Sequence, residues 1–214
     1  MSPILASIIG TSTLLTICSS SAIRFKSTYR PVFQPKNGAF SIWGVIFSLL
    51  LASSATMFVN QAPNSNSVIF VSASLILCSL WTLNFSEKKY IISFLLLLFG
   101  TLTSLVGLTF LKKSTDIESW LYETSFSLLS GWLFVATLLG FSIAMHENDI
   151  DDFDSYYMLL FASLFVYSTS IIVKKPILNV PILWALLFQS SINPIIVVSF
   201  GVNTLGLSKL FLTF

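Results

Sequence analysis

The sequence predicts an all-α fold, a polytopic bundle of transmembrane helices. Of the 214 residues, 55% are hydrophobic and only 9% are charged, whereas soluble domains carry roughly 25% charged residues. The mean hydropathy is +0.87. Seven or eight apolar segments follow one another along the chain, and a membrane-crossing helix needs about 20 predominantly apolar residues. The chain is therefore expected to be a multi-pass integral membrane protein, in a membrane that the sequence does not identify.

Five apolar segments in the first two thirds of the chain are each close to the length of one membrane crossing. They cover residues 3–22, 38–60, 68–85, 90–111 and 120–145. The first segment is rich in Ser and Thr, whose hydroxyl groups can bond to their own helix or to a neighbouring one. Gly100, Ser104 and Gly107 share one face of the fourth segment, which predicts close helix packing at that face.

The last third of the chain contains a sixth apolar segment, residues 156–173, and a longer apolar remainder. As a single helix, residues 177–214 would be about 55 Å long, too long for a hydrocarbon core of about 30 Å. Asn193-Pro194 is the expected break. Two shorter helices are therefore predicted, and the first of them is short for a full crossing. Seven and eight crossings both remain open.

The loop between the first two segments differs from ordinary membrane sequence. Pro31 and Pro35 disfavour helix in the residues before them, so an ordered, extended connection is predicted. Asn37 stands where a helix N-cap belongs, and Trp43 follows inside the next helix. Lys and Arg are densest in this loop, which by the positive-inside rule would face the cytoplasm, unless its charges serve a ligand. A stiff, basic and aromatic connection is typical of a lid over whatever the bundle holds.

This connection resembles the signature of the TspO/MBR family, the translocator-type or tryptophan-rich sensory membrane proteins. That signature is a basic residue with Pro, an aromatic residue, a second Pro, an Asn, and then Phe and Trp at the start of the second helix. The matching residues here are Arg30, Pro31, Phe33, Pro35, Asn37, Phe40 and Trp43. The sequence AFSIWG at residues 39–44 is similar to the corresponding sequence of the longer family members, which carry extra C-terminal helices.

Two further motifs follow on the expected helices. The Asn-x-x-Trp of the family's third helix is matched by residues 78–81, with Cys78 in place of Asn and Trp81 kept. The fifth-helix pattern FSxxxGWxxVAT is matched throughout residues 126–137, although Gly140 stands where the family often has Asn. The resemblance implies a TspO-like five-helix core in residues 1–146, with a lid loop at 23–37. Residues 147–214 would add two or three C-terminal transmembrane helices.

A binding site is predicted where these motifs meet. One face of the fifth helix carries Trp132, Ala136 and Gly140, which are spaced by four residues. The indole of Trp132 therefore lies next to two small residues, and an empty space, called the step below, is expected beside them. Trp43 and Trp81 could approach that face from the second and third helices. Planar aromatic walls with few polar groups suit a flat, mostly apolar ligand. The predicted ligand-binding residues are Arg30, Phe33, Pro35, Asn37, Phe40, Trp43, Trp81, Trp132 and Ala136.

The resemblance implies tetrapyrroles such as protoporphyrin, or sterols and related lipids, as ligands. Arg30 and Lys36 could pair with carboxylates at the mouth of the cavity. The first interpretation is therefore a ligand-binding, translocator-type protein, with transport, sequestration and sensing all open. The alternative is a structural or assembly protein that keeps the fold without a ligand, which the loss of polar groups at Cys78 and Gly140 favours. In that case the Trp residues serve only packing and interface anchoring.

Other polar residues have simpler interpretations. The acidic stretch 146–154 lacks the Gly and the Glu that complete a calcium loop, so a solvated turn is expected. His146, the single histidine, could be a haem ligand but is expected at the surface beside that turn. Glu123 is either a functional intramembrane carboxylate or a side chain that reaches the interface. Cys18 and Cys78 are expected to be free thiols.

The inventory of reactive groups argues against an enzyme. No nucleophile–base pair, metal-ligand cluster or phosphate loop can be assembled, so no catalytic residue, metal or cofactor is predicted beyond a bound tetrapyrrole. An enzyme that degrades a light-sensitive tetrapyrrole is the weaker alternative. The net charge of +2 is too small and too scattered to indicate nucleic acid. The expected partners are membrane lipid and a hydrophobic small molecule, with a homodimer or a partner protein in the membrane left open.

Overall fold

The computed structural model describes residues 2–21, 34–60, 63–111, 116–148, 155–189 and 194–208. These residues form only helices and the connections between them, which confirms the all-α class. In chain order the elements are α1 (Ser2–Ser21), η1 (Asn37–Ser41), α2 (Ile42–Val59), α3 (Ser65–Ser86), α4 (Tyr90–Thr109), α5 (Ile117–His146), α6 (Ser155–Ile172), η2 (Pro176–Asn179), α7 (Val180–Leu187) and α8 (Pro194–Ser208). The elements η1 and η2 are short 3₁₀ helices.

Four of the described helical segments are long and apolar enough to cross a membrane, as expected for a multi-pass integral membrane protein. They are Asn37–Val59, Ser65–Ser86, Tyr90–Thr109 and Ile117–His146. The segments Pro3–Ser19, Tyr157–Ile172, Pro176–Leu187 and Pro194–Ser208 are apolar but shorter. Because η2 and α7 have only four and eight residues, the choice between seven and eight crossings stays open.

Capping side chains explain where two helices begin before their apolar segments do. The Asn64 side chain accepts a hydrogen bond from the Asn66 N–H at 3.0 Å, and α3 starts at the residue after Asn64. The Asp116 side chain likewise accepts from the Ser119 N–H at 2.7 Å, and this bond lowers the pKa of the Asp116 carboxyl below its ordinary value. The predicted break at Asn193-Pro194 is confirmed, since α8 begins at Pro194.

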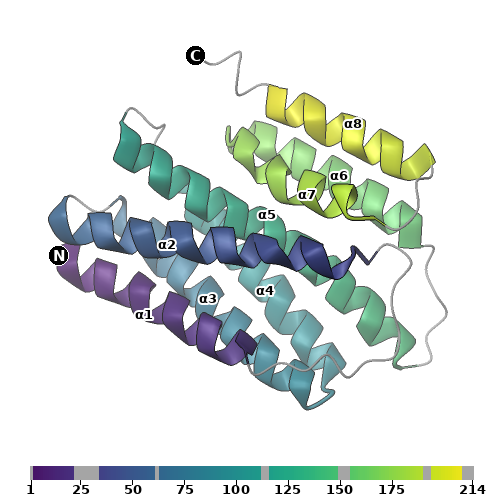
Figure 1. Ribbon diagram of the computed structural model, residues 1–214, viewed down its shortest axis with the longest axis horizontal. Helices are drawn as coiled ribbons and strands as arrows, with labels where there is room; N and C mark the ends of the chain where they lie inside the picture. Colours follow the sequence, from purple (N-terminus) through teal and green to yellow (C-terminus); the bar gives the residue numbers. More distant parts are fainter. Residues whose placement is uncertain are drawn as a thin grey trace.

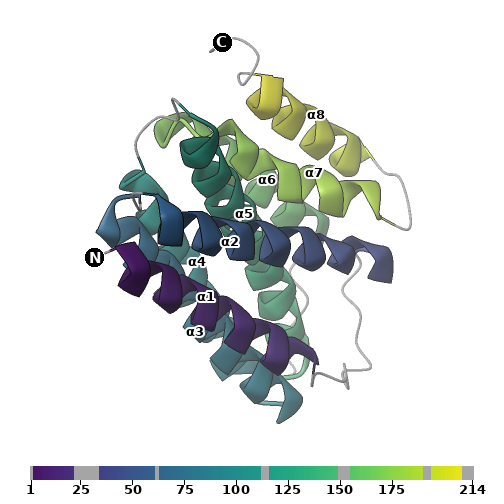
Figure 2. The same cartoon turned by 60° about the vertical axis from the view of Figure 1, so that its left-hand side comes forward.

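The helices pack in two groups around α5. Helices α1 to α4 pack against one another and, through α2 and α4, against one side of α5, whereas α6, α7, α8 and η2 pack on the other side (Figures 1 and 2). The buried hydrophobic core is continuous across both groups, from Ile9 of α1 through Leu129 of α5 to Ile182 of α7. The division into a core at 1–146 and an addition at 147–214 therefore stays a prediction.

Buried hydroxyl groups join the helices of the first group. The Thr16 hydroxyl of α1 donates to the Leu75 carbonyl of α3 at 3.0 Å. Ser53 of α2 and Ser125 of α5 share a hydrogen bond of 2.9 Å. In an apolar interior such bonds satisfy polar groups that would otherwise be costly to bury. The Ser and Thr residues of the first segment thus act partly between helices, as expected.

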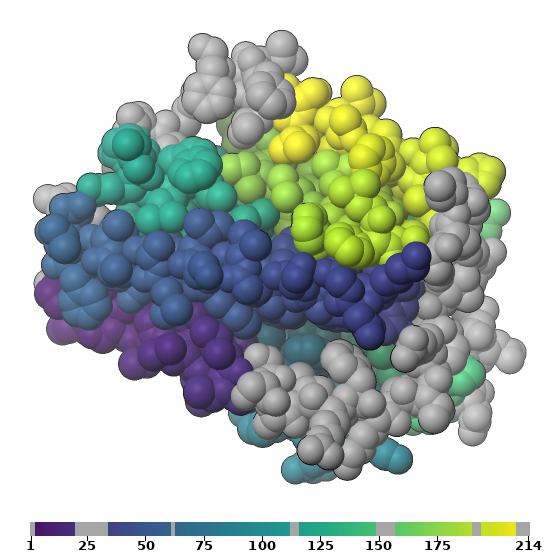
Figure 3. Space-filling view, in the orientation of Figure 1, coloured from purple at the N-terminus to yellow at the C-terminus, as the bar shows by residue number. Residues whose placement is uncertain are grey.

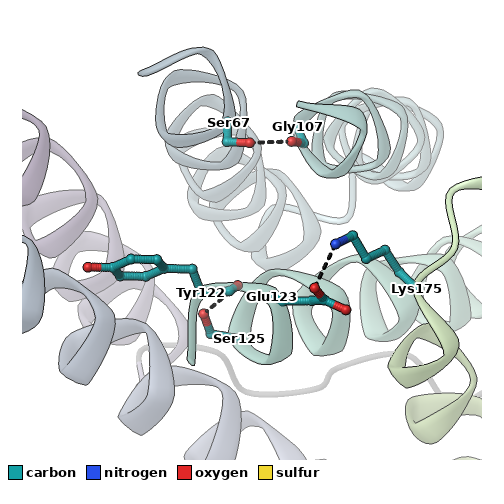
Figure 4. Close-up of polar contacts among 6 residues, drawn as sticks. All are labelled: Ser67, Gly107, Tyr122, Glu123, Ser125 and Lys175. Atoms are coloured by element: carbon teal, nitrogen blue, oxygen red, sulfur yellow. Dashed lines mark hydrogen bonds and ion pairs between the residues drawn. The ribbon is translucent and has the colours of Figure 1, made fainter. Parts of the chain in front are cut away.

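The small-residue face of α4 packs on α3, as predicted. A Cβ atom added to Gly107 would lie 3.1 Å from Val71 Cγ2, so the absence of a side chain permits this approach. The Ser67 hydroxyl donates to the Gly107 carbonyl at 2.6 Å (Figure 4). Gly100 similarly faces the Ser74 carbonyl of α3.

Replacing Ser67 with Ala is expected to lower the free energy of unfolding by about 1 kcal/mol, because one interhelical hydrogen bond is lost. The measurement is denaturing-detergent unfolding of the purified protein. Thr103→Ala is the control, since the Thr103 hydroxyl donates to the Phe99 carbonyl of its own helix. If both variants lost the same free energy of unfolding, the hydrogen bond between α3 and α4 would contribute no more stability than one within a single helix.

Candidate ligand-binding site

A cavity of about 170 Å³ lies between α2, α3, α4 and α5, beside the residues that precede η1. Among the residues that the structure describes, its lining is almost entirely apolar and carries no ionisable side chain. The lining residues are Gln34, Phe40, Trp43, Trp81, Phe85, Leu97, Trp132, Ala136, Leu139, Gly140 and Ile143. The Gln34 amide and the indole N–H groups are the polar side-chain groups among them.

Trp132 is the centre of the aromatic wall. Its side chain is only 1% exposed. The rings of Phe40 and Trp43 both meet it edge to face, with centroids 5.9 and 6.3 Å away and interplanar angles of 87°. Trp43 also stacks on Phe47 at 5.0 Å. These separations and orientations are those that aromatic pairs favour, so the start of α2 and the middle of α5 form one packed unit.

The predicted stripe of α5 lies along the cavity, but the empty step expected at Gly140 is partly filled. Trp132, Ala136 and Gly140 all line the cavity. A Cβ atom on Gly140 would lie 3.1 Å from Leu97 Cδ1, so a side chain of α4 occupies much of the space that the sequence left open. Trp81 of α3 completes the wall and contacts Phe85 at a centroid distance of 6.0 Å.

Two of the cavity-lining indoles lack a hydrogen-bond partner. Within the part of the chain that the structure describes, the N–H groups of Trp81 and Trp132 are buried and have no acceptor. A buried polar group without a partner is costly and uncommon in folded proteins. An oxygen of a bound ligand would satisfy either N–H, provided that the ring turns its edge toward the cavity.

The predicted lid is described only from Gln34 to Asn37. Arg30, Phe33 and the rest of residues 23–33 lie outside the described residues. Pro35 is buried, whereas Lys36 and Asn37 are exposed, and none of these three lines the cavity. Gln34, which the sequence did not single out, does line it.

The prediction that Asn37 caps the second helix is wrong. Asn37 is the first residue of η1, and Lys36 occupies the N-cap position without a side-chain cap. The chain passes through this 3₁₀ turn into α2, where the Ile42 N–H donates to the carbonyl groups of Ala39 and Phe40. The Ala39 N–H, one of the groups that an Asn37 cap would bind, donates instead to the Lys36 carbonyl at 2.9 Å.

The structure therefore brings together five of the predicted residues, Phe40, Trp43, Trp81, Trp132 and Ala136. It places Pro35 and Asn37 outside the lining. Leu139 and Ile143 follow Ala136 at spacings of three and seven, so the helical period could have found them. Gln34 and Leu97 carry no such signal, because their positions depend on how the chain folds back.

Glu123 pairs with a lysine from the opposite group of helices. Lys175 Nζ lies 2.6 Å from Glu123 Oε2, and the two side chains are only 5% and 12% exposed (Figure 4). This buried ion pair joins α5 to the connection between α6 and η2. The burial of the Glu123 side chain argues against one that reaches the membrane interface, whereas a functional role for this carboxylate stays a prediction.

The end of α6 directs Lys175 toward α5. Lys174 adopts the left-handed conformation with φ 56°. The Lys174 N–H donates to the Ile171 carbonyl at 3.2 Å, and the Lys175 N–H donates to the Ser170 carbonyl at 3.0 Å. This pair of bonds is the Schellman motif, which ends a helix with a sharp turn. Lys175 therefore leaves the helix axis at the level of Glu123.

The other predicted polar residues that the structure describes do not line the cavity. His146 is exposed at the last residue of α5, and the acidic residues 149–154 lie outside the described residues. Cys18 is exposed and Cys78 is buried, and no disulfide joins them.

Comparison with known proteins identifies a family. Residues 4–208 match the model of a family described as TSPO-like protein, and the match spans both groups of helices. No curated protein and no solved structure matches the chain.

Proposed function

Because the chain belongs to the TSPO-like family, as its motifs predicted, we propose that it binds a flat, mostly apolar ligand in the cavity between Trp43, Trp81 and Trp132. The observation that carries this proposal is the enclosure of one cavity by three indoles, two of which have buried N–H groups without an acceptor in the described part of the chain. A tetrapyrrole or a sterol-like lipid has the required shape. Transport, sequestration and sensing would all begin with this binding step.

The lining supports an apolar ligand body rather than a buried charge. Within the described part of the chain, no lysine, arginine or histidine lines the cavity, and a carboxylate among these residues would lose its hydration without a cationic partner. Any carboxylates of the ligand would stay at the cavity mouth. Pairing with Arg30 remains a prediction, and Lys36, which is exposed, could reach only a group outside the lining.

The size of the cavity restricts how a tetrapyrrole could bind. Sites for drug-sized molecules usually have about 300–1,000 Å³, whereas this cavity has about 170 Å³. The half-buried rings of Trp43 and Trp81, or the residues that precede α2, would have to move outward. Tetrapyrrole binding is therefore expected to include a conformational step.

A structural or assembly role is the second candidate. Cys78 and Gly140 stand where the resembling family has polar residues; Cys78 is buried, and Gly140 packs against Leu97. Neither position offers a ligand the amide that Asn would supply. A protein of this kind would act through a homodimer or a complex with another membrane protein, and neither proposal includes catalysis. Turnover of a tetrapyrrole in light would contradict both.

Replacing Trp132 with Ala is expected to weaken protoporphyrin binding by roughly tenfold or more, because the central wall of the cavity is lost. Binding is measured by quenching of Trp fluorescence in detergent-purified protein. Trp120→Ala is the matched control, since Trp120 is 48% exposed and does not line the cavity. Ala136→Leu, which fills the cavity, serves as a second variant with the core intact.

Protoporphyrin and its dimethyl ester separate the two parts of the proposal. Similar saturable binding of both would show that the apolar ring is recognised. Much tighter binding of the acid, lost in Arg30→Gln, would show that the lid holds carboxylates. Linear, unsaturable quenching by both would mean partition into detergent, and the structural role would then be preferred.

A further inference from the structure

The C-terminal end of α7 is bonded to the segment that leads into α2. The Lys36 N–H donates to the Phe188 carbonyl at 2.9 Å, and Trp184 Nε1 donates to the Ala39 carbonyl at 2.8 Å. The Phe188 ring covers Gly38 so closely that an added Cβ atom would lie 2.7 Å from Phe188 Cε1. Figure 3 shows α7 lying directly on the first part of α2.

The bonded segment supplies two residues of the cavity lining. Gln34 and Phe40 flank the bonded residues, and both line the cavity. Phe40 also forms the edge-to-face contact with Trp132. Both hydrogen bonds to α7 use main-chain atoms of Lys36 and Ala39, so substitutions of the side chains in this segment leave the bonds available.

The other end of α7 is anchored on α5. A Cβ atom added to Gly131 would lie 2.5 Å from the Leu178 carbonyl oxygen and 3.0 Å from Pro181 Cγ. The segment from η2 to α7 is therefore in contact with α5 one residue before Trp132, and with the start of α2 at its far end. It links the two elements that form the aromatic wall.

We propose that Trp184 and Phe188 are positioning residues of the ligand site, which hold the segment Gln34–Phe40 against the cavity and so set the rates at which ligand enters and leaves. The proposal rests on the proposed function, because it concerns access to the same cavity. It assigns a task to α7, which belongs to the group of helices that follows α5 in the chain. Loss of the α7 contact should free the segment without removing any lining residue.

The test measures access to position 34 with and without ligand. A Gln34→Cys thiol is introduced in a Cys18→Ser background and labelled with a maleimide, with mass spectrometry separating the two remaining sites. Cys78, which is 1% exposed, reports any general loosening of the bundle. Trp184→Phe removes the hydrogen bond to the Ala39 carbonyl. Gly38→Ala acts from the α2 side of the contact, because its added Cβ atom would displace the Phe188 ring. Trp120→Phe is the matched control.

Trp184→Phe and Gly38→Ala are expected to raise the labelling rate at position 34 by roughly two- to tenfold, the equivalent of one hydrogen bond. The dissociation rate of protoporphyrin, followed by stopped-flow fluorescence, should rise by a similar factor, with Cys78 still protected and Trp120→Phe unchanged. Unchanged labelling in both variants would overturn the proposal, as would parallel labelling of Cys78. If the variants label faster but the protein without these substitutions shows no saturable porphyrin binding, the proposed function would be overturned instead.

Discussion

Replacing Lys175 with Met is expected to lower the free energy of unfolding by about 3–5 kcal/mol. The substitution leaves the Glu123 carboxylate, which is 12% exposed, without the partner that compensates its loss of hydration. Breaking one half of a buried ion pair is much costlier than replacing both halves. Glu123→Gln combined with Lys175→Met should therefore recover most of the stability that the single substitution removes.

An exposed pair of the same geometry provides the control. Lys89 Nζ lies 2.6 Å from Glu87 Oε2, but both side chains are more than half exposed. Lys89→Met should change the free energy of unfolding by less than about 0.5 kcal/mol, because solvent screens the pair. The unmodified protein, Lys175→Met, the double variant and Lys89→Met are compared by titration with a denaturing detergent at one pH. A Lys175 variant no less stable than the Lys89 variant would show that water reaches the Glu123 pair.

Replacing Gly131 with Ala is expected to lower the free energy of unfolding by about 1–3 kcal/mol, the usual cost of overpacking. The added Cβ atom would lie 2.5 Å from the Leu178 carbonyl oxygen, a main-chain atom that cannot rotate away. The segment η2–α7 would have to move off α5, and its contact with the start of α2 would weaken. Thermal unfolding in detergent measures the loss.

At two other helical glycines, replacement with Ala is expected to raise the free energy of unfolding. A Cβ atom at Gly44 or Gly201 would meet nothing within 4 Å. Gly→Ala at either position should stabilise the protein by about 0.5–1 kcal/mol, because Ala favours the helix more than Gly does. If Gly131→Ala raised the free energy of unfolding as these two substitutions should, the close contact between η2 and α5 would be contradicted.

The helices could be predicted because apolar length and polar connections are local properties of a sequence. The same is true of the break at Pro194 and of the stripe that begins at Trp132, since a helical period fixes which residues share a face. A period does not say which distant residue meets that face. The pairing of Glu123 with Lys175, the filling of the Gly140 step by Leu97 and the bond from Trp184 to Ala39 all join residues far apart in the chain.

The error at Asn37 has a different origin. Asn is a favoured cap, and the preference was applied to a chain that turns through a 3₁₀ helix before α2. The Lys36 carbonyl accepts the N–H of Ala39, which an Asn37 side chain would otherwise bind as a cap. Propensity rules identify residues able to cap a helix, whereas the local backbone path decides whether a cap is needed.

The ion pair of Glu123 also bears on how the protein is made. Glu123 belongs to the fifth helix and Lys175 follows the sixth, so the ribosome completes the carboxylate's helix well before its partner exists. Chains generally fold from the N-terminus during synthesis, and an unpaired charge in the hydrocarbon core is costly. We therefore expect the start of α5 to stay at the membrane interface, where water reaches Glu123, until the C-terminal helices arrive. On this expectation, the bundle completes its assembly only after its last third has been translated.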